Sequence, residues 1–411
     1  MTSADPRRWL WVPLLAAACG GGSSHAPSTC GTSSFVPSAA GANVLPISVA
    51  GAGCLPTGYF NEPCVSATVC DPANPSSCVT IGGLLLDTGS IGLRVFSQAL
   101  GSLRPSLPAI TQGGNPVAEC IAFLDGSSQW GPVVGGSVVL GGEPPVPVPI
   151  HVIDSTFAGR PSPCAGAQTD PASAGYNGIL GVGEWIQDCG AGCAPPSSSA
   201  GSPYYVCSGS SCATTTVDLA FQVTNPVAAL PTDGNGVVVE LPSLPVTGAA
   251  SASGSLVLGI GTRANNVPGA SVAAFPLDLG TGTFLTATPG RARADPAFLD
   301  TGSNGLFFPT ADARLTPCPR SGSSWFCPAS PVALTATNAG AAGTPSASVC
   351  FEIASIDALP GSVGVAPAVG GPDMSPSPQF DWGLPFHFGR SVYVGIETTH
   401  SPLGTGPLVA Y

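Results

Sequence analysis

The sequence contains no lysine: its 11 basic residues are all arginine, and they face 23 acidic residues, for a formal net charge of −12. A chain this acidic is poorly suited to bind nucleic acid or an anionic membrane surface, so we expect neither as a partner. Beyond the N-terminal segment, no stretch reaches the ~18 consecutive apolar residues that a membrane-spanning helix needs. Charged residues make up only 8% of the chain, which leaves little room for long amphipathic helices.

Several signatures of enzyme sites are missing as well. The chain has no His-Glu-x-x-His, no Gly-x-Ser-x-Gly and no phosphate-binding loop with a lysine, the motifs of zinc peptidases, serine hydrolases and nucleotide-binding enzymes. Its 4 histidines show no metal-ligand spacing. We therefore expect no metal and no organic cofactor. A glycosidase would use two carboxylates, but nothing else in the chain indicates a sugar site.

Glycine and proline are abundant, with 55 and 45 residues. Short runs rich in valine, threonine and leucine lie between glycine, proline and serine turns, a pattern typical of an all-β protein with few short helices. The length of 411 residues suggests two domains of ordinary size.

The N-terminus has the features of an export signal. Two arginines precede a short apolar run, and three alanines then lead to Cys19 and a Gly/Ser-rich stretch, which resembles a bacterial lipoprotein signal. We predict a signal peptide at residues 1–18 and a flexible tether at 19–45, with Cys19 acylated and anchored to the lipid bilayer of the cell envelope. Ordinary cleavage after residue 18, without an anchor, is the alternative.

The 15 cysteines support export to an oxidising compartment. If Cys19 is acylated, an even number remains for disulfides; an odd number of them lies before residue 213 and an odd number after residue 317. Full pairing therefore requires at least one bridge between the two halves. Two close pairs could bind zinc instead, although disulfides are favoured in an exported chain: Cys189 with Cys193, and Cys207 with Cys212.

One stretch of the chain occurs twice. In residues 84–93 and in residues 297–306, an apolar run ends in Asp-Thr-Gly-Ser, and the apolar sequence resumes with a glycine-leucine pair. Each apolar run predicts a buried strand. A carboxylate at the end of such a strand needs hydrogen-bond donors, because burial disfavours its charged form. The duplication predicts that Asp87 and Asp300 face each other across a pseudo-twofold axis.

The paired motifs resemble the pepsin-like aspartic proteases, in which each of two lobes contributes one such motif to a shared carboxylate pair. Three further stretches are similar to strands of that family: residues 176–183, 254–261 and 381–390. More narrowly, the chain resembles a group of exported bacterial proteins of unknown function with the same skeleton. The resemblance covers residues 45–411. It implies a bilobal double β-barrel with pseudo-twofold symmetry, with an N-terminal lobe at 46–220 and a C-terminal lobe at 221–411.

The resemblance also implies roles for the motif residues. Asp87 and Asp300 would share one proton, activate a water and hydrolyse a peptide bond. Ser90 and Ser303 would hydrogen-bond the outer carboxylate oxygens. Thr88 and Thr301 would lock the two loops together, and Gly89 and Gly302 would complete the turns.

A hairpin over the site is where the sequence departs from the family. Aligning Gly126 and Ser127 with the family's flap places Phe123 at the position of a conserved family tyrosine. Counting seven residues from the first catalytic aspartate places Arg94 at the position of its tryptophan partner. We predict that Arg94 contacts Phe123 or Trp130 and positions the hairpin over Asp87. Alternatively, Arg94 points to solvent and the hairpin packs by its apolar residues alone.

Two functions from different classes follow from these features. The first is peptide-bond hydrolysis of a polypeptide substrate by a monomeric aspartic endopeptidase. The second is a non-catalytic lipoprotein of the cell envelope that binds a peptide in the same cleft; a disulfide-rich envelope protein with a vestigial cleft is a third reading. The duplicated dyad favours the enzyme, and the altered flap favours the binder.

Overall fold

The computed structural model describes residues 30, 34–37, 40–373, 375 and 377–411. The predicted signal peptide, Cys19 and its acylation lie outside these residues. No helix in the described part of the chain is long and apolar enough to cross a membrane.

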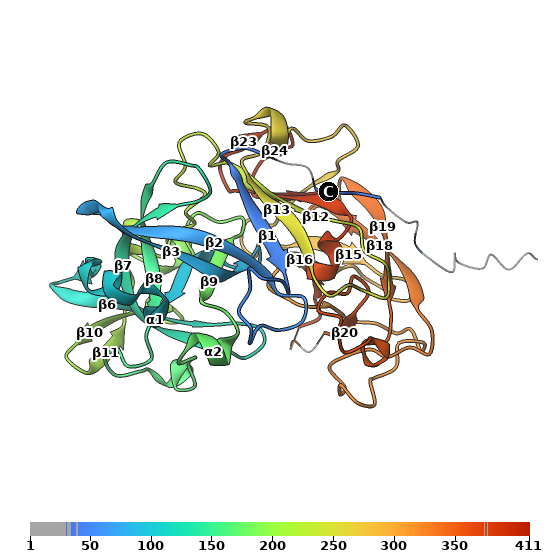
Figure 1. Cartoon of the computed structure of the whole chain (residues 1–411), viewed down its shortest axis with the longest axis horizontal. Coiled ribbons are helices and arrows are strands. Elements are labelled where there is room, and N and C mark those ends of the chain that lie inside the picture. The colour runs from blue at the N-terminus through green and yellow to red at the C-terminus, as the bar shows by residue number, and fades with distance from the viewer. Residues whose placement is uncertain (1–29, 31–33, 38–39, 374, 376) are drawn as a thin grey trace, which may run out of the picture.

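The protein is mainly β, with 41% strand and 9% helix, and it forms two lobes. The prediction of an all-β, two-lobed fold is confirmed, and one lobe contains a closed barrel while the other contains a curled half-barrel. Figure 1 shows the two lobes side by side, with β1 and β13 between them.

The first half of the chain supplies most of the barrel lobe. Its strands are β1 (Val44–Val49), β2 (Pro63–Asp71), β3 (Asn74–Asp87), β4 (Ile91–Phe96), β5 (Thr111–Gln112), β6 (Asn115–Ala122), β7 (Ser128–Val139), β8 (Val146–Ile153), β9 (Gly178–Val182), β10 (Tyr204–Ser208) and β11 (Ser211–Thr214). Strands β7, β8, β4, β9, β3 and β2 follow one another in the sheet, and β2 pairs again with β7, which closes the barrel.

The second half supplies the connecting strands and the half-barrel. Its strands are β12 (Gly236–Leu241), β13 (Ala252–Leu258), β14 (Ala274–Pro276), β15 (Phe284–Ala287), β16 (Asp295–Asp300), β17 (Leu306–Phe308), β18 (Val332–Ala339), β19 (Ser346–Ile353), β20 (Gly370–Pro372), β21 (Phe380–Gly383), β22 (Arg390–Gly395), β23 (His400–Ser401), β24 (Gly404–Thr405) and β25 (Leu408–Ala410). The half-barrel sheet runs β19-β18-β15-β16-β21-β17-β20, and β1 joins the barrel to β13.

The helices are short. They are α1 (Ser97–Leu100), α2 (Pro171–Ala174), and the 3-10 turns η1 (Gly101–Ser106), η2 (Ser162–Cys164), η3 (Gly190–Cys193), η4 (Leu219–Phe221), η5 (Ala264–Asn266), η6 (Ile356–Ala358) and η7 (Leu384–His387).

The two lobes have cores of different composition. The core of the barrel and the connecting sheet consists almost entirely of valine, leucine and isoleucine. The half-barrel core is rich in rings: Phe308, Phe351 and Phe380 stack or meet edge to face with one another, and Phe351 and Phe380 also contact Trp382. Burial of these apolar side chains provides most of the stabilisation of each lobe.

Seven disulfides connect the described part of the chain, and they indicate an exported protein. Cys30 pairs with Cys350, across a separation of 320 residues. The bridge between the halves that cysteine parity predicts is therefore confirmed. The two close pairs are disulfides and not a zinc site: Cys189–Cys193 and Cys207–Cys212.

The described residues of the predicted tether are bonded to the second half of the chain. Besides the Cys30 disulfide, the backbone N–H of Phe35 donates to the Ser243 hydroxyl at 3.0 Å. The buried Asn43 amide donates to Leu258 O at 2.9 Å, and β1 begins at Val44. These contacts anchor the chain ahead of the expected start of the first lobe at residue 46.

Candidate active site

Two turns of the same sequence lie at the ends of β3 and β16. The last five residues of β3 are buried, whereas β16 alternates between buried and at least partly exposed residues up to Asp300. Each strand ends in the carboxylate of its turn, and both carboxylates line the same cleft. At the first turn, the N–H of Gly89 donates to Asp87 Oδ1 at 2.8 Å, and the Ser90 hydroxyl donates to Asp87 Oδ2. These donors compensate for the desolvation of the carboxylate.

The second turn repeats this geometry. The N–H of Gly302 donates to Asp300 Oδ1 at 2.7 Å, and the Ser303 hydroxyl donates to Asp300 Oδ2 at 2.8 Å. The backbone N–H of Ser303 adds a third donor at 3.2 Å. Each carboxylate is therefore held by its own turn.

The two threonines bind the turns to each other. The N–H of Thr88 donates to the Thr301 hydroxyl, and the N–H of Thr301 donates to the Thr88 hydroxyl, both at 3.0 Å. Each hydroxyl in turn donates across the axis to a carbonyl of the opposite strand, Leu299 O at 3.0 Å and Leu86 O at 2.7 Å. All four groups are buried, so this reciprocal exchange fixes the position of one turn relative to the other.

The two glycines bring the carboxylates together. A Cβ atom on Gly302 would lie 2.9 Å from Asp87 Oδ1 and 3.0 Å from Asp300 Oδ1. A Cβ atom on Gly89 would lie 2.8 Å from Asp300 Cγ. No side chain fits at either position, and the inner oxygens of both carboxylates face the same small space.

A third carboxyl, which the sequence analysis did not identify, lies beside Asp300. Asp381 on β21 is 8% exposed, and its Oδ1 has no hydrogen-bond partner in the described part of the chain. Phe298 and Asp300 on β16 pair with Asp381 and Gly383 on β21 in parallel register, and residues two apart on a strand share a face. Burial, then Asp87 and then Asp381 raise the pKa of Asp300 well above its usual range.

A cleft of about 850 Å³ opens over the dyad. It is lined from one side by the tip of the β6–β7 hairpin and from the other by residues 281–284 and 302–304. Phe123 and Ser127 are both in this lining, and the N–H of Phe123 donates to Ser127 O at 2.9 Å. Gly126 has a φ of 85° at the hairpin turn, which explains the glycine there.

Trp130 is in the same hairpin but does not face the cleft. It is fully buried, its indole N–H donates to Phe157 O at 2.7 Å, and its ring meets Tyr205 edge to face. Trp130 therefore anchors the hairpin strand in a separate small core.

Arg94 also anchors the hairpin, but through different partners than predicted. Among the described residues, cation–π contacts are formed by Arg390 and none is formed by Arg94. Its guanidinium donates to Glu119 Oε2 at 2.5 Å and to Asp188 Oδ2 at 2.8 Å. The predicted aromatic partner is not found as a cation–π pair among the described residues; two buried carboxylates bind the cation instead.

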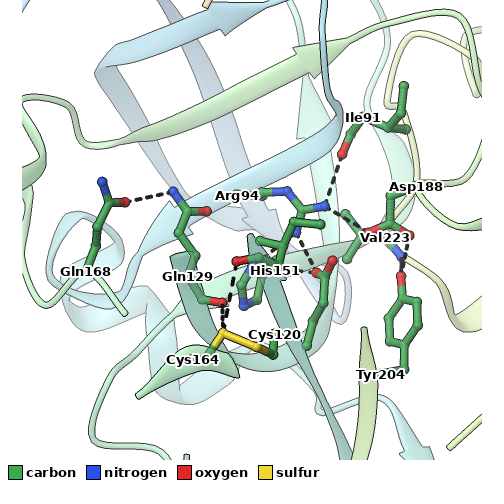
Figure 2. A network of polar contacts seen from close by, with 12 residues as sticks. Ile91, Arg94, Cys120, Gln129, His151, Cys164, Gln168, Asp188, Tyr204 and Val223 are labelled. Atoms are coloured by element: carbon green, nitrogen blue, oxygen red, sulfur yellow. Dashed lines mark hydrogen bonds and ion pairs between the residues drawn. A yellow bond between two sulfur atoms is a disulfide. The ribbon is translucent and has the colours of Figure 1, made fainter. Parts of the chain in front are cut away.

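Figure 2 shows this network beneath the hairpin. His151 Nδ1 lies 3.2 Å from Arg94 Nη1, and the Tyr204 hydroxyl donates to Asp188 Oδ1 at 2.5 Å. Burial, and then the positive charge of Arg94, lower the pKa of His151, so this histidine is neutral. Burial and then Asp188 raise the pKa of Glu119, while Arg94 opposes that shift. The Cys120–Cys164 disulfide fixes β6, the strand that carries Glu119.

Residues before β2 support the second motif from the opposite half of the chain. The Tyr59 hydroxyl donates to Gly302 O at 3.3 Å, and the Asn61 amide donates to Asn304 O at 2.9 Å. Burial raises the pKa of Tyr59, which keeps its hydroxyl a neutral donor. No motif marks these residues in the sequence, so pattern analysis could not find them.

The described residues contain two groups with the composition of a metal site. Each contains two cysteines that are joined in a disulfide, Cys54–Cys64 and Cys318–Cys327. A disulfide has no thiolate to offer a metal, so neither group is a candidate metal centre.

Comparison with known proteins gives a family but no activity. No protein of curated function matches the chain. One family model, described as "Protein of unknown function (DUF3443)", matches residues 39–411. This match covers the barrel, the half-barrel, both Asp-Thr-Gly-Ser turns and the hairpin. The chain therefore belongs to the family of proteins of unknown function DUF3443.

Proposed function

We propose that this protein is an aspartic peptidase with a pepsin-like arrangement, in which Asp87 and Asp300 hydrolyse a peptide bond. The observation that carries the proposal is the convergence of the two carboxylates on one space, with a Gly302 Cβ position within 3.0 Å of an oxygen of each. Two carboxyls this close do not both ionise, so one serves as base and the other as acid.

The surroundings favour a division of labour within the dyad. Asp300 keeps the proton, because burial, Asp87 and Asp381 all raise its pKa. Asp87 then accepts a proton from a water molecule, whose oxygen attacks the carbonyl carbon of the peptide, while Asp300 gives its proton to the carbonyl oxygen. Collapse of the tetrahedral intermediate moves a proton to the leaving amine and returns the dyad to its starting state.

The test is cleavage of denatured protein substrates between about pH 3 and pH 7. We expect wild-type protein to cleave, and Asp87→Asn and Asp300→Asn each to lose activity by at least about 10³-fold, since the two groups act as a unit. Ser199→Ala, a change outside the lining of the cleft, is the control. Activity that survives in either dyad variant would remove the dyad from the mechanism.

A second function is a peptide binder that uses the same cleft without catalysis. The observation that favours it is the hairpin, where phenylalanine and a buried, ion-paired arginine replace the hydrogen-bonded tyrosine and tryptophan of the pepsin-like enzymes. Peptide binding by wild-type protein, with no cleavage at any pH, would select this function. In either case we propose a monomer attached to the cell envelope through acylated Cys19, which intact-mass measurement of the membrane fraction tests.

A further inference from the structure

The charges that line the cleft are unbalanced. Of the described lining residues, five are acidic and one is basic. The basic residue, Arg94, is 1% exposed and is already bound by Glu119 and Asp188. It therefore offers no positive charge to a ligand, and the dyad, Glu184 and Asp125 leave the cleft with a negative field.

Glu184 has a particular place among these acids. It lies two residues after β9, whose Gly181 pairs with Asp87, and it lines the same cleft as the dyad. Its carboxylate reaches the loop of the opposite half: a Cβ atom on Gly282 would lie 2.2 Å from Glu184 Oε1. Gly282 also has a φ of 70°, so both its conformation and its lack of a side chain leave room for this carboxylate.

Glu184 has no compensating cation within the part of the chain that the structure describes, since none of the ion pairs there includes it. The neighbours that act on its ionisation are the Trp185 indole and two further carboxylates, Glu397 and Asp87. A half-buried carboxylate next to other carboxylates gains more from a cation than an exposed one does, because less water screens the pair.

We propose that the cleft selects polypeptides that place a lysine or arginine side chain against Glu184, which makes Glu184 the residue that determines specificity. The proposal rests on the peptide-binding cleft of the proposed peptidase and names its substrate class. A basic side chain of the substrate supplies the positive charge that no described residue of the protein places beside Glu184. Apolar side chains of the same substrate then contact Phe123 and Phe298, which line the cleft on either side of the dyad.

The experiment measures binding and cleavage separately. Short fluorescein-labelled peptides that differ only in one central residue, lysine, glutamine or glutamate, are titrated with the mature full-length protein and followed by anisotropy. The same peptides are assayed for cleavage. We expect the lysine peptide to bind at least about tenfold more tightly than the glutamine peptide, and the glutamate peptide to bind most weakly.

Three variants assign the effect to one carboxylate. Glu184→Gln should reduce the lysine preference to less than about threefold, and Glu184→Asp should retain part of it. Asp218→Asn, which removes one exposed charge outside the lining of the cleft, should leave the preference unchanged. In wild-type protein the preference should grow from about pH 5 to about pH 8, because burial raises the pKa of Glu184 to about 7 and its charge appears across this range. In Glu184→Gln the preference should not change with pH.

The outcomes separate the two proposals. Selective, tight binding of the lysine peptide without cleavage supports the inference and contradicts the peptidase. Cleavage without a lysine preference supports the peptidase and overturns the inference. A lysine preference that survives in Glu184→Gln overturns the inference, whether or not the peptide is cleaved. A thermal denaturation curve for each variant shows that it is folded.

Discussion

The two copies of the Asp-Thr-Gly-Ser turn share their internal hydrogen bonds but not their surroundings. In the first half, Arg94 on β4 pairs with Ile179 on β9. In the second half, Phe307 on β17 pairs with Asp381 on β21. Arg94 and Phe307 each lie seven residues after the aspartate of their turn, so these are equivalent positions. Each half thus pairs one ionisable residue with one apolar residue. In the first half the ionisable residue is the cation Arg94 on β4, whereas in the second half it is the carboxyl of Asp381 on β21.

The exchange has opposite consequences in the two lobes. The cation in the first half collects two carboxylates, Glu119 and Asp188, and so ties the hairpin and a nearby loop to the barrel. The carboxyl in the second half has no cation beside it among the described residues and instead adds to the raised pKa of Asp300. The asymmetry teaches that one half uses its charged residue to hold elements of the cleft together, while the other places a carboxyl that adds to the raised pKa of Asp300.

Removing the cation of the first half should have the largest effect. Arg94→Met leaves Glu119 and Asp188 buried without a counter-charge, which we expect to cost about 3–5 kcal/mol of unfolding free energy. Urea denaturation measures this loss, and hydrogen exchange at residues 121–131 should become faster. The matched change Phe307→Leu in the second half deletes no charge and should cost only about 1 kcal/mol.

A triple variant tests whether the loss of stability in Arg94→Met comes from the uncompensated carboxylates. Adding Glu119→Gln and Asp188→Asn to Arg94→Met removes the uncompensated charges, so the triple variant should regain part of the lost stability. If Arg94→Met is as stable as the wild type, the network does not hold the hairpin.

The glycines of the two turns provide the second test, since they are equivalent in geometry. Gly302→Ala would place a methyl group within 3.0 Å of oxygens of both carboxylates, and Gly89→Ala would place one 2.8 Å from Asp300 Cγ. A displacement of the dyad by about 1 Å should lower kcat by about 10²-fold in each variant. Cleavage kinetics measure this loss. Gly361→Ala, at an exposed turn where a Cβ meets nothing within 4 Å and φ is not positive, is the control for general effects of the substitution.

Unequal losses in the two glycine variants would sharpen the comparison. A larger loss at Gly302 fits its contact with both carboxylates, whereas Gly89 approaches only Asp300. Full activity in both variants would mean that the reacting groups do not occupy the space between these turns.

Much of this arrangement could be predicted from the sequence. The duplicated turn identifies the dyad, because two identical strand ends require equivalent partners, and cysteine parity requires a bridge between halves. The partners of Arg94 could not be predicted, since Glu119 and Asp188 lie 25 and 94 residues away and no motif marks either one. Their contact depends on how the barrel closes.

Asp381 is a different case, because a signal for it was present. Gly181 and Gly383 pair with the two dyad aspartates, so aligning the glycines places Ile179 and Asp381 at equivalent positions. The alignment shows an aspartate where the first half has an apolar residue. Comparing the two copies of the repeat is therefore enough to identify Asp381, because it is a carboxyl at a buried strand position that is apolar in the other copy.

The smallest effect is expected from making the second half like the first at that position, with Asp381→Ile. Burial raises the pKa of Asp381 well above its usual range, and Asp87 and Asp373 add to the shift. A carboxyl whose folded-state pKa is raised contributes stability that is present below its unfolded pKa of about 3.9 and is lost as pH rises through the folded pKa. The isoleucine variant lacks that loss, so it should gain stability over wild-type protein as pH rises above about 4, and urea denaturation at several pH values measures the gain.

The same change removes one cause of the raised pKa of Asp300. Since the proposed mechanism uses Asp300 as the proton donor, the alkaline limb of the pH–rate profile should move to lower pH. Asp381→Asn separates charge from packing: it should move the same limb but gain less stability, because its amide remains polar and buried. If neither variant moves the limb, Asp381 does not act on the dyad, and the two halves differ at this position in packing alone.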